Sequence, residues 1–260
     1  MNEINITCED CMKLMSRYPN NHFDLAIVDP PYGCAVVGGG GDMSCITSSQ
    51  NWLKNERGRF GGRGGRFDKY KIERTGGTWV SKYGAYINHW DIAPEPEYFN
   101  ELFRVSKNQI IWGGNYFDLP PSRNFIVWRK LTISENFSMA MAEYAWTSIC
   151  GNAKIIECAP QDKERFHPTQ KPVYLYKKLL QWYSKPGYKI LDTHLGSGSI
   201  AIACSDFSLS LTACEIDIDY YSAAMQRVKE YQKQQIFFSE WRAHEQPDKA
   251  ALYFDFYLER

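Results

Sequence analysis

The sequence has no excess of charge of either sign, because 30 Lys and Arg residues balance 30 Asp and Glu residues. It contains no apolar run near the roughly 18 residues that a membrane-spanning helix requires. Residues 1–11 show neither the basic region nor the apolar core of a secretion signal. We therefore expect a cytoplasmic protein without a membrane partner, in which a local basic patch would have to hold any polyanion.

The eight cysteines lack the arrangement of a disulfide framework or of a structural zinc site. Cys8 and Cys11 form a C-x-x-C pair, but no second Cys or His pair follows at a similar spacing. Thiols in a chain without a secretion signal are normally reduced. We interpret Cys8 and Cys11 as small thiols in a loop after a strand, and we expect no bound metal.

A length of 260 residues, of which 44% are hydrophobic, suffices for one domain, 1–260, with a buried α/β core. The apolar runs 24–28 and 188–191 have the pattern of buried parallel strands, and polar residues follow each directly. The other expected strands are 109–112, 124–128 and 209–213, and the expected helices are 173–183, with Pro172 in its first turn, 200–203 and 220–235. This order predicts a mostly parallel twisted sheet with flanking helices, whose ligands bind at the carboxyl ends of the strands.

The segment from about 33 to 88 differs from the rest of the chain in composition. Residues 33–84 contain 13 of the 19 glycines, and residues 54–74 contain eight Lys and Arg against three Asp and Glu. Such a segment cannot bury enough apolar surface to offset its ordering entropy. It is either a solvated insertion or a loop that becomes ordered on nucleic acid. In the second case four arginines would contact DNA phosphates: Arg57, Arg59, Arg63 and Arg66.

A glycine-rich turn follows the run 188–191. Residues 192–201 read D-T-H-L-G-S-G-S-I-A and contain the pattern G-x-G-x-x-A, while Glu215 ends the next expected strand. Glycines let the backbone approach a ligand, and the later carboxylate accepts hydrogen bonds from ribose hydroxyls. The pattern predicts an adenosine-cofactor site, without separating a nicotinamide dinucleotide from S-adenosylmethionine. A tight turn that binds nothing is the alternative.

A second motif, Asp29-Pro30-Pro31-Tyr32, follows the run 24–28. Two consecutive prolines fix the backbone and remove two N–H donors, which holds the Pro30 carbonyl beside the Asp29 carboxylate. Two acceptors next to a tyrosine ring suit a planar amino group. The motif therefore favours methyl transfer to the exocyclic amine of a base over hydride transfer, and a strand-ending turn with a packed tyrosine is the structural alternative.

These motifs resemble those of the S-adenosylmethionine-dependent DNA methyltransferases that methylate amino groups, which carry D/N/S-P-P-Y/F and F-x-G-x-G motifs. Here D-P-P-Y precedes the glycine motif, which is the permuted order of the β class of that family. H-P-T-Q-K-P at 167–172 resembles the element that helps to close the cofactor site. Further blocks that look like those of the β class lie at 90–91, 110–115, 127–130 and 143–146. The resemblance covers most of the chain and implies a Rossmann-like methyltransferase fold.

The resemblance also implies roles for individual residues. The catalytic residues would be Asp29, Pro30, Pro31 and Tyr32, with Asp29 and the Pro30 carbonyl on the target amine and Tyr32 stacked on the extruded base. The cofactor-binding residues would be Asp10, His167, Thr169, Lys171, Asp192, His194, Gly196, Ser197, Gly198 and Glu215. A helix N-cap is the alternative role for Asp10, and ordinary loop-to-helix capping is the alternative for 167–172.

Three positions depart from the family pattern beside the glycines. Thr193 and His194 stand where Pro and Phe are common, and Ser199 replaces the usual Thr. We expect His194 either to lie over the sulfonium end of the cofactor or to replace an aromatic wall. The glycines, Asp192 and the preceding strand keep the family pattern.

The implied activity is transfer of a methyl group to adenine N6 in double-stranded DNA, because the family's cytosine members more often carry Ser at the position of Asp29. Methylation of cytosine N4 stays open, since Asp29 accepts from either amine. Enzymes acting on RNA or protein amides usually carry the glycine motif first, and a binding module with a decayed site would lack Asp29, Tyr32 or the glycines. Segments 33–88 and about 147–166 are the candidates for base recognition, and a homodimer and a cognate restriction nuclease are possible partners.

Overall fold

Eight strands form one sheet in the computed structural model, which describes residues 3–33, 92–135, 140–160 and 165–245, with side chains up to residue 235. The strands are β1 (Ile4–Cys8), β2 (Leu25–Val28), β3 (Gln109–Trp112), β4 (Phe125–Lys130), β5 (Ala142–Thr147), β6 (Lys154–Cys158), β7 (Lys189–Asp192) and β8 (Ser210–Glu215). The two apolar runs that the sequence assigned to buried parallel strands are β2 and β7, so that prediction is confirmed.

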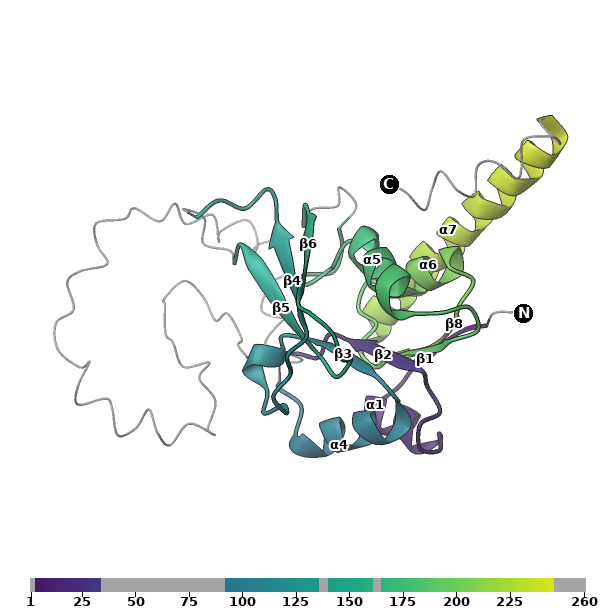
Figure 1. Ribbon diagram of the computed structural model, residues 1–260. Helices are drawn as coiled ribbons and strands as arrows, with labels where there is room; N and C mark the ends of the chain where they lie inside the picture. Colours follow the sequence, from purple (N-terminus) through teal and green to yellow (C-terminus); the bar gives the residue numbers. More distant parts are fainter. Residues whose placement is uncertain (1–2, 34–91, 136–139, 161–164, 246–260) are drawn as a thin grey trace, which may run out of the picture.

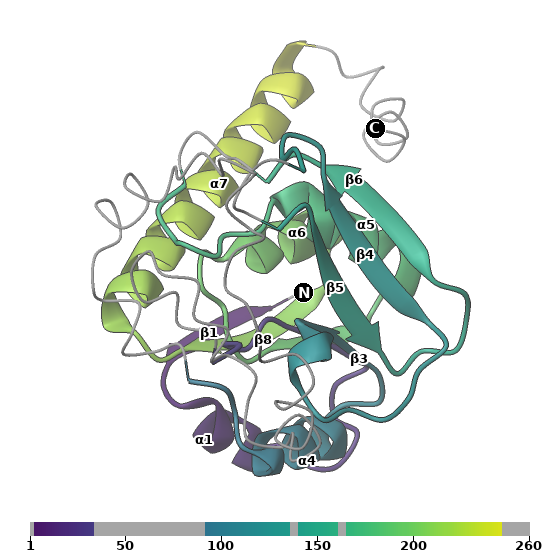
Figure 2. The ribbon, with the colours of Figure 1, turned by 90° about the vertical axis from the view of Figure 1, so that its left-hand side faces the viewer.

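The strand order across the sheet is β1-β8-β7-β2-β3-β5-β4-β6. All neighbours are parallel except β5, which runs antiparallel to both β3 and β4. Only residues 131–141 join β4 to β5, fewer than the roughly dozen residues that a parallel crossover needs. The predicted mostly parallel α/β sheet is confirmed, and Figure 2 shows its strong twist from β1 to the steeply inclined β4, β5 and β6.

Helices cover both faces of the sheet. They are α1 (Cys11–Ser16), α4 (Pro96–Val105), α5 (Val173–Tyr183), α6 (Ser199–Asp206) and α7 (Ile218–Glu245), with a 3₁₀ turn, η2 (Gly114–Tyr116). Figure 1 shows α1 and α4 on one face and α5, α6 and the long α7 on the other. Pro172 is the N-cap of α5 with ψ 143°, so it precedes the first turn in which the sequence analysis had put it. The helix expected at 220–235 extends over the whole of α7.

The chain leaves the centre of the sheet in opposite directions from β2 and β7. The segment after β2 passes through α4 to β3 on one side, and the segment after β7 passes through α6 to β8 on the other. In an open α/β sheet, such a reversal opens a crevice at the carboxyl ends of the two central strands. Asp29 and Thr193 directly follow these two strands, so the fold brings both motifs to one edge.

The two faces of the sheet carry separate hydrophobic cores. In β2, Leu25 and Ile27 pack into the core beneath α5 and α6, whereas Ala26 and Val28 pack into the core beneath α1 and α4. All four side chains are buried. Burial on both faces explains why this strand has no polar alternation, and it fixes the position of the residue that follows it.

Several sequence predictions lie outside the described residues. They concern the Gly-rich and Arg-rich segment from 34 to 91, including Arg57, Arg59, Arg63 and Arg66. Segment 147–166 is described except for 161–164, and it contains the edge strand β6. Among the described helices, none is long and apolar enough to cross a membrane.

Candidate active site

A cavity of about 830 Å³ opens at the carboxyl ends of β1, β2, β7 and β8. Residues of both motifs and of the 167–172 element line it together. The predicted site residues in its wall are Asp10, Asp29, Pro30, Pro31, Tyr32, His167, Thr169, Lys171, His194, Gly196, Ser197 and Glu215. Asp192 and Gly198, which the sequence analysis had also assigned to the cofactor, do not line the cavity.

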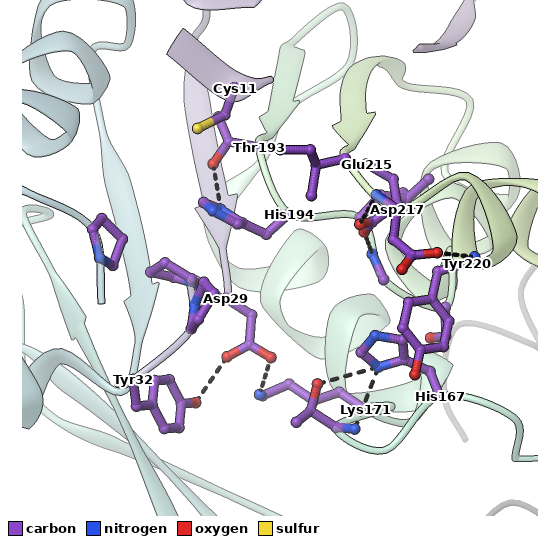
Figure 3. Close-up of a pocket in the computed structure, with 18 of the residues that line it drawn as sticks. Cys11, Asp29, Tyr32, His167, Lys171, Thr193, His194, Glu215, Asp217 and Tyr220 are labelled. Atoms are coloured by element: carbon purple, nitrogen blue, oxygen red, sulfur yellow. Dashed lines mark hydrogen bonds and ion pairs between the residues drawn. The ribbon is translucent and has the colours of Figure 1, made fainter. Parts of the chain in front are cut away.

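The Asp29 carboxylate has a protein partner on each of its oxygens. Tyr32 Oη donates to Oδ1 at 2.8 Å, and Lys171 Nζ donates to Oδ2 (Figure 3). Burial raises the pKa of the Asp29 carboxyl above its usual range, and the Lys171 ammonium opposes that shift. A substrate amine that binds this carboxylate must therefore share or displace one of these partners.

Lys171 links Asp29 to a second carboxylate that the sequence analysis did not single out. Its ammonium lies 3.2 Å from Glu143 Oε2, and Lys130 Nζ lies 2.6 Å from Glu143 Oε1. Burial lowers the pKa of Lys171, but Asp29 and Glu143 outweigh burial and raise it above its usual value. Burial raises the pKa of Glu143, but Lys171 and Lys130 outweigh it and lower the pKa to about 2. Lys171, assigned by resemblance to the cofactor, thus pairs with the catalytic motif.

Tyr32 packs against a second tyrosine at the mouth of the cavity. Its ring stacks on Tyr116 with centroids 4.8 Å apart and planes 17° apart. Gly113 lies under the same ring with φ 66°, and a Cβ there would come within 2.2 Å of Tyr32 Cε1. Gly113 belongs to a block that the sequence analysis quoted without a role. Its absent side chain makes room for the Tyr32 ring.

The glycine turn is held by hydrogen bonds to Glu215. The Gly196 N–H donates to Glu215 Oε2 at 2.8 Å, and the Asp217 N–H donates to Oε1 at 3.0 Å. Gly196 has φ 53° and Gly198 has φ 75°. A Cβ at Gly198 would lie 3.2 Å from Val228 of α7, so this glycine permits close helix packing rather than ligand contact. Gly196 and Glu215 together form a wall of the cavity.

Asp192 stabilises the turn from below. Its buried carboxylate accepts a hydrogen bond from the His194 N–H at 3.0 Å. Burial raises the pKa of Asp192 to about 8. The side chain therefore acts on the turn that carries His194 instead of facing the cavity.

Two imidazoles, buried His167 and half-buried His194, flank the turn. The His167 ring packs against Tyr220 at 4.3 Å between centroids, and a Cβ at Gly196 would lie 3.4 Å from its Cε1 atom. His194 Nδ1 lies 3.0 Å from Thr193 Oγ1, which in turn lies 2.6 Å from Tyr98 Oη. Burial lowers the pKa of His167 to about 3 and that of His194 to about 4, so both rings are neutral near pH 7.

Asp10 is the N-cap of α1, as the structural alternative predicted. Its Oδ1 accepts from the N–H groups of Met12 at 2.9 Å and Lys13 at 3.1 Å. Asp10 also lines the cavity, so its predicted contact with the cofactor adenine stays a prediction. Among the described residues, no group of three or more His, Cys, Asp or Glu side chains could hold a metal ion.

The fold and the site together define an α/β protein whose central switch point combines a glycine turn, the Glu215 carboxylate that accepts its Gly196 N–H, and the Asp29-Pro30-Pro31-Tyr32 motif. Comparison with known proteins adds a similarity to a family. Residues 106–226 match the family model described as DNA methylase, a range that covers the glycine turn but begins after Asp29. Over this range the chain is similar to the DNA methylase family.

Two relatives cover most of the chain. A putative methylase, YubD of Escherichia coli strain K12, is 22% identical over 237 residues, covering 86% of this chain and 89% of its own length. The type II methyltransferase M2.DpnII of Streptococcus pneumoniae is 23% identical over 251 residues, covering 88% and 90%.

Two solved structures resemble the model at low sequence identity. The M1.HpyAVI–SAM complex is 16% identical with a TM-score of 0.49, covering 86% of this chain and 98% of that one. The cytosine-N4-specific PvuII DNA methyltransferase is 11% identical with a TM-score of 0.49, covering 90% and 93%.

Proposed function

We propose that the chain transfers the methyl group of S-adenosylmethionine to the N6 amino group of an adenine flipped out of double-stranded DNA. The observation that carries this proposal is one cavity lined by Asp29, Pro30 and Tyr32 together with Gly196 and Glu215. Direct transfer between two ligands requires that both bind in one cavity. Here residues proposed to hold the cofactor and residues proposed to accept the target amine line the same cavity.

The residues on the cofactor side fit S-adenosylmethionine. Each Glu215 oxygen accepts one backbone N–H and retains a lone pair for a ribose hydroxyl. The backbone of Gly196 faces the cavity without a side chain, and the volume of about 830 Å³ admits both an adenosine and a base. Gly196, Ser197 and Glu215 would hold the adenosine part, and His194 would lie at the sulfonium end. When bound, the cofactor supplies an electrophilic methyl group.

Asp29 and Pro30 would act on the target amine. The lone pair of an exocyclic amine is delocalised into the ring, which makes the nitrogen a poor nucleophile. Hydrogen bonds from its two N–H groups to the Asp29 carboxylate and the Pro30 carbonyl favour a pyramidal nitrogen with its lone pair exposed. Flipping the base costs a few kcal/mol of unstacking, which a stack on Tyr32 would offset in part.

Asp29 supports adenine as the target through its resemblance to the family's adenine members. Cytosine N4 is the alternative, because a carboxylate accepts from either amine. Arg57, Arg59, Arg63 and Arg66 are our candidates for the DNA phosphates. A homodimer, a cognate restriction nuclease and a cytoplasmic location likewise stay predictions.

The test is transfer of labelled methyl from S-adenosylmethionine to unmethylated DNA, followed by digestion of the product to nucleosides. Wild type should yield labelled N6-methyldeoxyadenosine, and Asp29→Ala should yield none while it still binds the cofactor in calorimetry. Asp118→Ala, which removes an exposed carboxylate outside the cavity, is the matched control and should retain wild-type transfer.

The other outcomes discriminate between the alternatives. Labelled N4-methyldeoxycytidine would retain the mechanism and change the target base. Cofactor binding without transfer to any DNA would overturn the proposal and direct the search to RNA or protein amides.

A further inference from the structure

Four charged side chains form an alternating row beside the catalytic motif. Lys130, Glu143, Lys171 and Asp29 are linked in that order by contacts between their charged atoms. The Lys171 and Lys130 side chains are only 3% and 7% exposed. Two cations and two anions cancel, so the row is neutral as a whole, but each buried charge depends on its neighbours.

Lys171 lies between two carboxylates that differ in how many of their oxygens accept a hydrogen bond. Both Asp29 oxygens have hydrogen-bond partners, Tyr32 and Lys171. Glu143 Oε1 is held by Lys130, but the buried Oε2 lies 3.2 Å from Lys171 Nζ without an aligned hydrogen bond. Glu143 Oε2 therefore already forms an ion pair with the ammonium that contacts Asp29, and it can accept a closer, aligned hydrogen bond from that ammonium.

A target amine at Asp29 Oδ2 either shares that oxygen with Lys171 or takes its place, and the second case is an exchange of partners. Leaving a buried ammonium without a carboxylate is strongly unfavourable, and replacing it by a neutral amine removes its compensating charge. A small movement of Nζ from Asp29 toward Glu143 Oε2 avoids this cost, because the ammonium then exchanges one carboxylate for another. Lys130 keeps Glu143 ionised and fixed while this occurs.

We propose that Glu143 is a positioning residue of the methyl transfer, which receives the Lys171 ammonium as the target amine occupies Asp29. The proposal rests on the proposed function and deepens it. It assigns to β5 and β4 a part in binding the base amine, although neither Glu143 nor Lys130 belongs to a motif with a predicted role.

The exchange predicts that two substitutions, Glu143→Gln and Lys171→Met, each slow methyl transfer and that each partly relieves the defect caused by the other. In Glu143→Gln the ammonium has Asp29 as its sole carboxylate, so it competes with the amine and the single-turnover rate of methyl transfer should fall about tenfold. In Lys171→Met two carboxylates face each other without the cation between them, and the rate should also fall. The double variant removes the competing cation together with its second carboxylate, so it should be faster than either single variant.

The measurement is the single-turnover rate at saturating S-adenosylmethionine and DNA, with cofactor affinity by calorimetry and thermal unfolding of each variant. Cofactor affinity should stay within about twofold of wild type in all three variants, because the cofactor wall is untouched. Glu157→Gln, the same change at an exposed ion pair on neighbouring β6, is the matched control and should leave the rate unchanged.

Three results would overturn the exchange. A wild-type rate in Glu143→Gln would mean that the amine uses Oδ1 and displaces Tyr32 instead. A double variant no faster than the slower single variant would reduce the row to structural support. A wild type that binds cofactor and methylates no DNA would remove the proposed function, and the exchange with it.

Discussion

The two halves of the cavity are built from different interactions. On the cofactor side, backbone N–H groups bind Glu215 and neutral histidine rings pack beside the glycine turn. On the target side, Asp29 is held by side chains alone, through a tyrosine hydroxyl and a buried ammonium (Figure 3). We expect the first half to be fixed by the fold before a ligand binds, whereas the proposed exchange requires the second half to change partners. Substitutions in the two halves should therefore affect different quantities, cofactor affinity in the first half and the rate of methyl transfer in the second.

The largest expected effect falls on the target side alone. Gly113→Ala should reduce methyl transfer about 100-fold, because its Cβ would displace the Tyr32 ring from its position beside Asp29. Cofactor affinity should remain that of wild type. The measurement is single-turnover transfer alongside calorimetry.

Gly187→Ala is the matched control for this change. Gly187 also has a positive φ, 85°, but a Cβ there has no neighbour within 4 Å. It carries the same backbone penalty without the displaced ring. Equal loss of activity in the two variants would refute the steric role of Gly113.

The next prediction concerns the affinity for DNA, which we expect to depend on the Arg-rich segment and not on either half of the cavity. Replacing Arg57, Arg59, Arg63 and Arg66 by alanine should weaken DNA binding about tenfold or more at moderate salt. The slope of log K against log salt should fall by roughly 0.9 for each lost phosphate contact. Fluorescence anisotropy over a salt series measures both. Arg129→Ala, an exposed arginine paired with Glu157, should leave the slope unchanged.

Glu215→Gln tests the cofactor side. Loss of the negative charge weakens acceptance from both the turn and the ribose, so S-adenosylmethionine affinity should fall about tenfold in calorimetry. The rate at saturating cofactor should change little. Glu230→Gln on the exposed side of α7 is the control, and a larger loss of rate than of affinity would contradict the division into two halves.

The last prediction concerns stability and not activity: the free energy of unfolding should depend on pH through the cofactor side. The pKa of His167 is about 3 in the folded protein, below the value of about 6.5 expected when unfolded. The unfolded state therefore binds the proton first, and the free energy of unfolding should fall as pH drops from about 6.5 toward 3, by at most about 1.4 kcal/mol per pH unit. Above pH 6.5 this contribution is constant.

Urea unfolding at several pH values checks that slope. His167→Gln should lower stability at pH 8 through lost packing on Tyr220, yet it should show a flatter decline below pH 6.5. An unchanged slope in the variant would assign the acid sensitivity to other groups, of which His194 is the first candidate.

Much of the fold was predictable because its signals are local. The runs that became β2 and β7 are apolar throughout, since both faces of these strands are covered. The reversal of β5 was not predicted, because strand direction depends on which neighbours pair across the sheet. Pairing places Glu143 opposite Trp128, two residues before Lys130, and no pattern within either segment indicates this register.

The candidate site divides in the same way. Residue types and spacing in 29–32 and 192–198 were sufficient to predict an amine acceptor and an adenosine turn, since each depends on consecutive backbone atoms. Lys171 was assigned to the cofactor because it belongs to the 167–172 element. The contact between Lys171 and Asp29 joins residues that are 142 positions apart in the sequence. Asp192 and Gly198 were likewise assigned to the cofactor from their position in the motif. In the structure the Asp192 carboxyl binds the His194 N–H, and Gly198 packs against α7.

What the amino-acid order specified was the chemistry that short stretches of chain perform: buried strands, tight turns, and a carboxylate directly before two prolines that lack N–H donors. Packing specified the partners of each charge. A buried ion needs a counter-charge close to it in the folded protein. The separation of the two residues along the sequence does not indicate whether the fold brings them together. The row from Lys130 to Asp29 exists because β2, β4, β5 and the segment before α5 meet at one edge of the sheet.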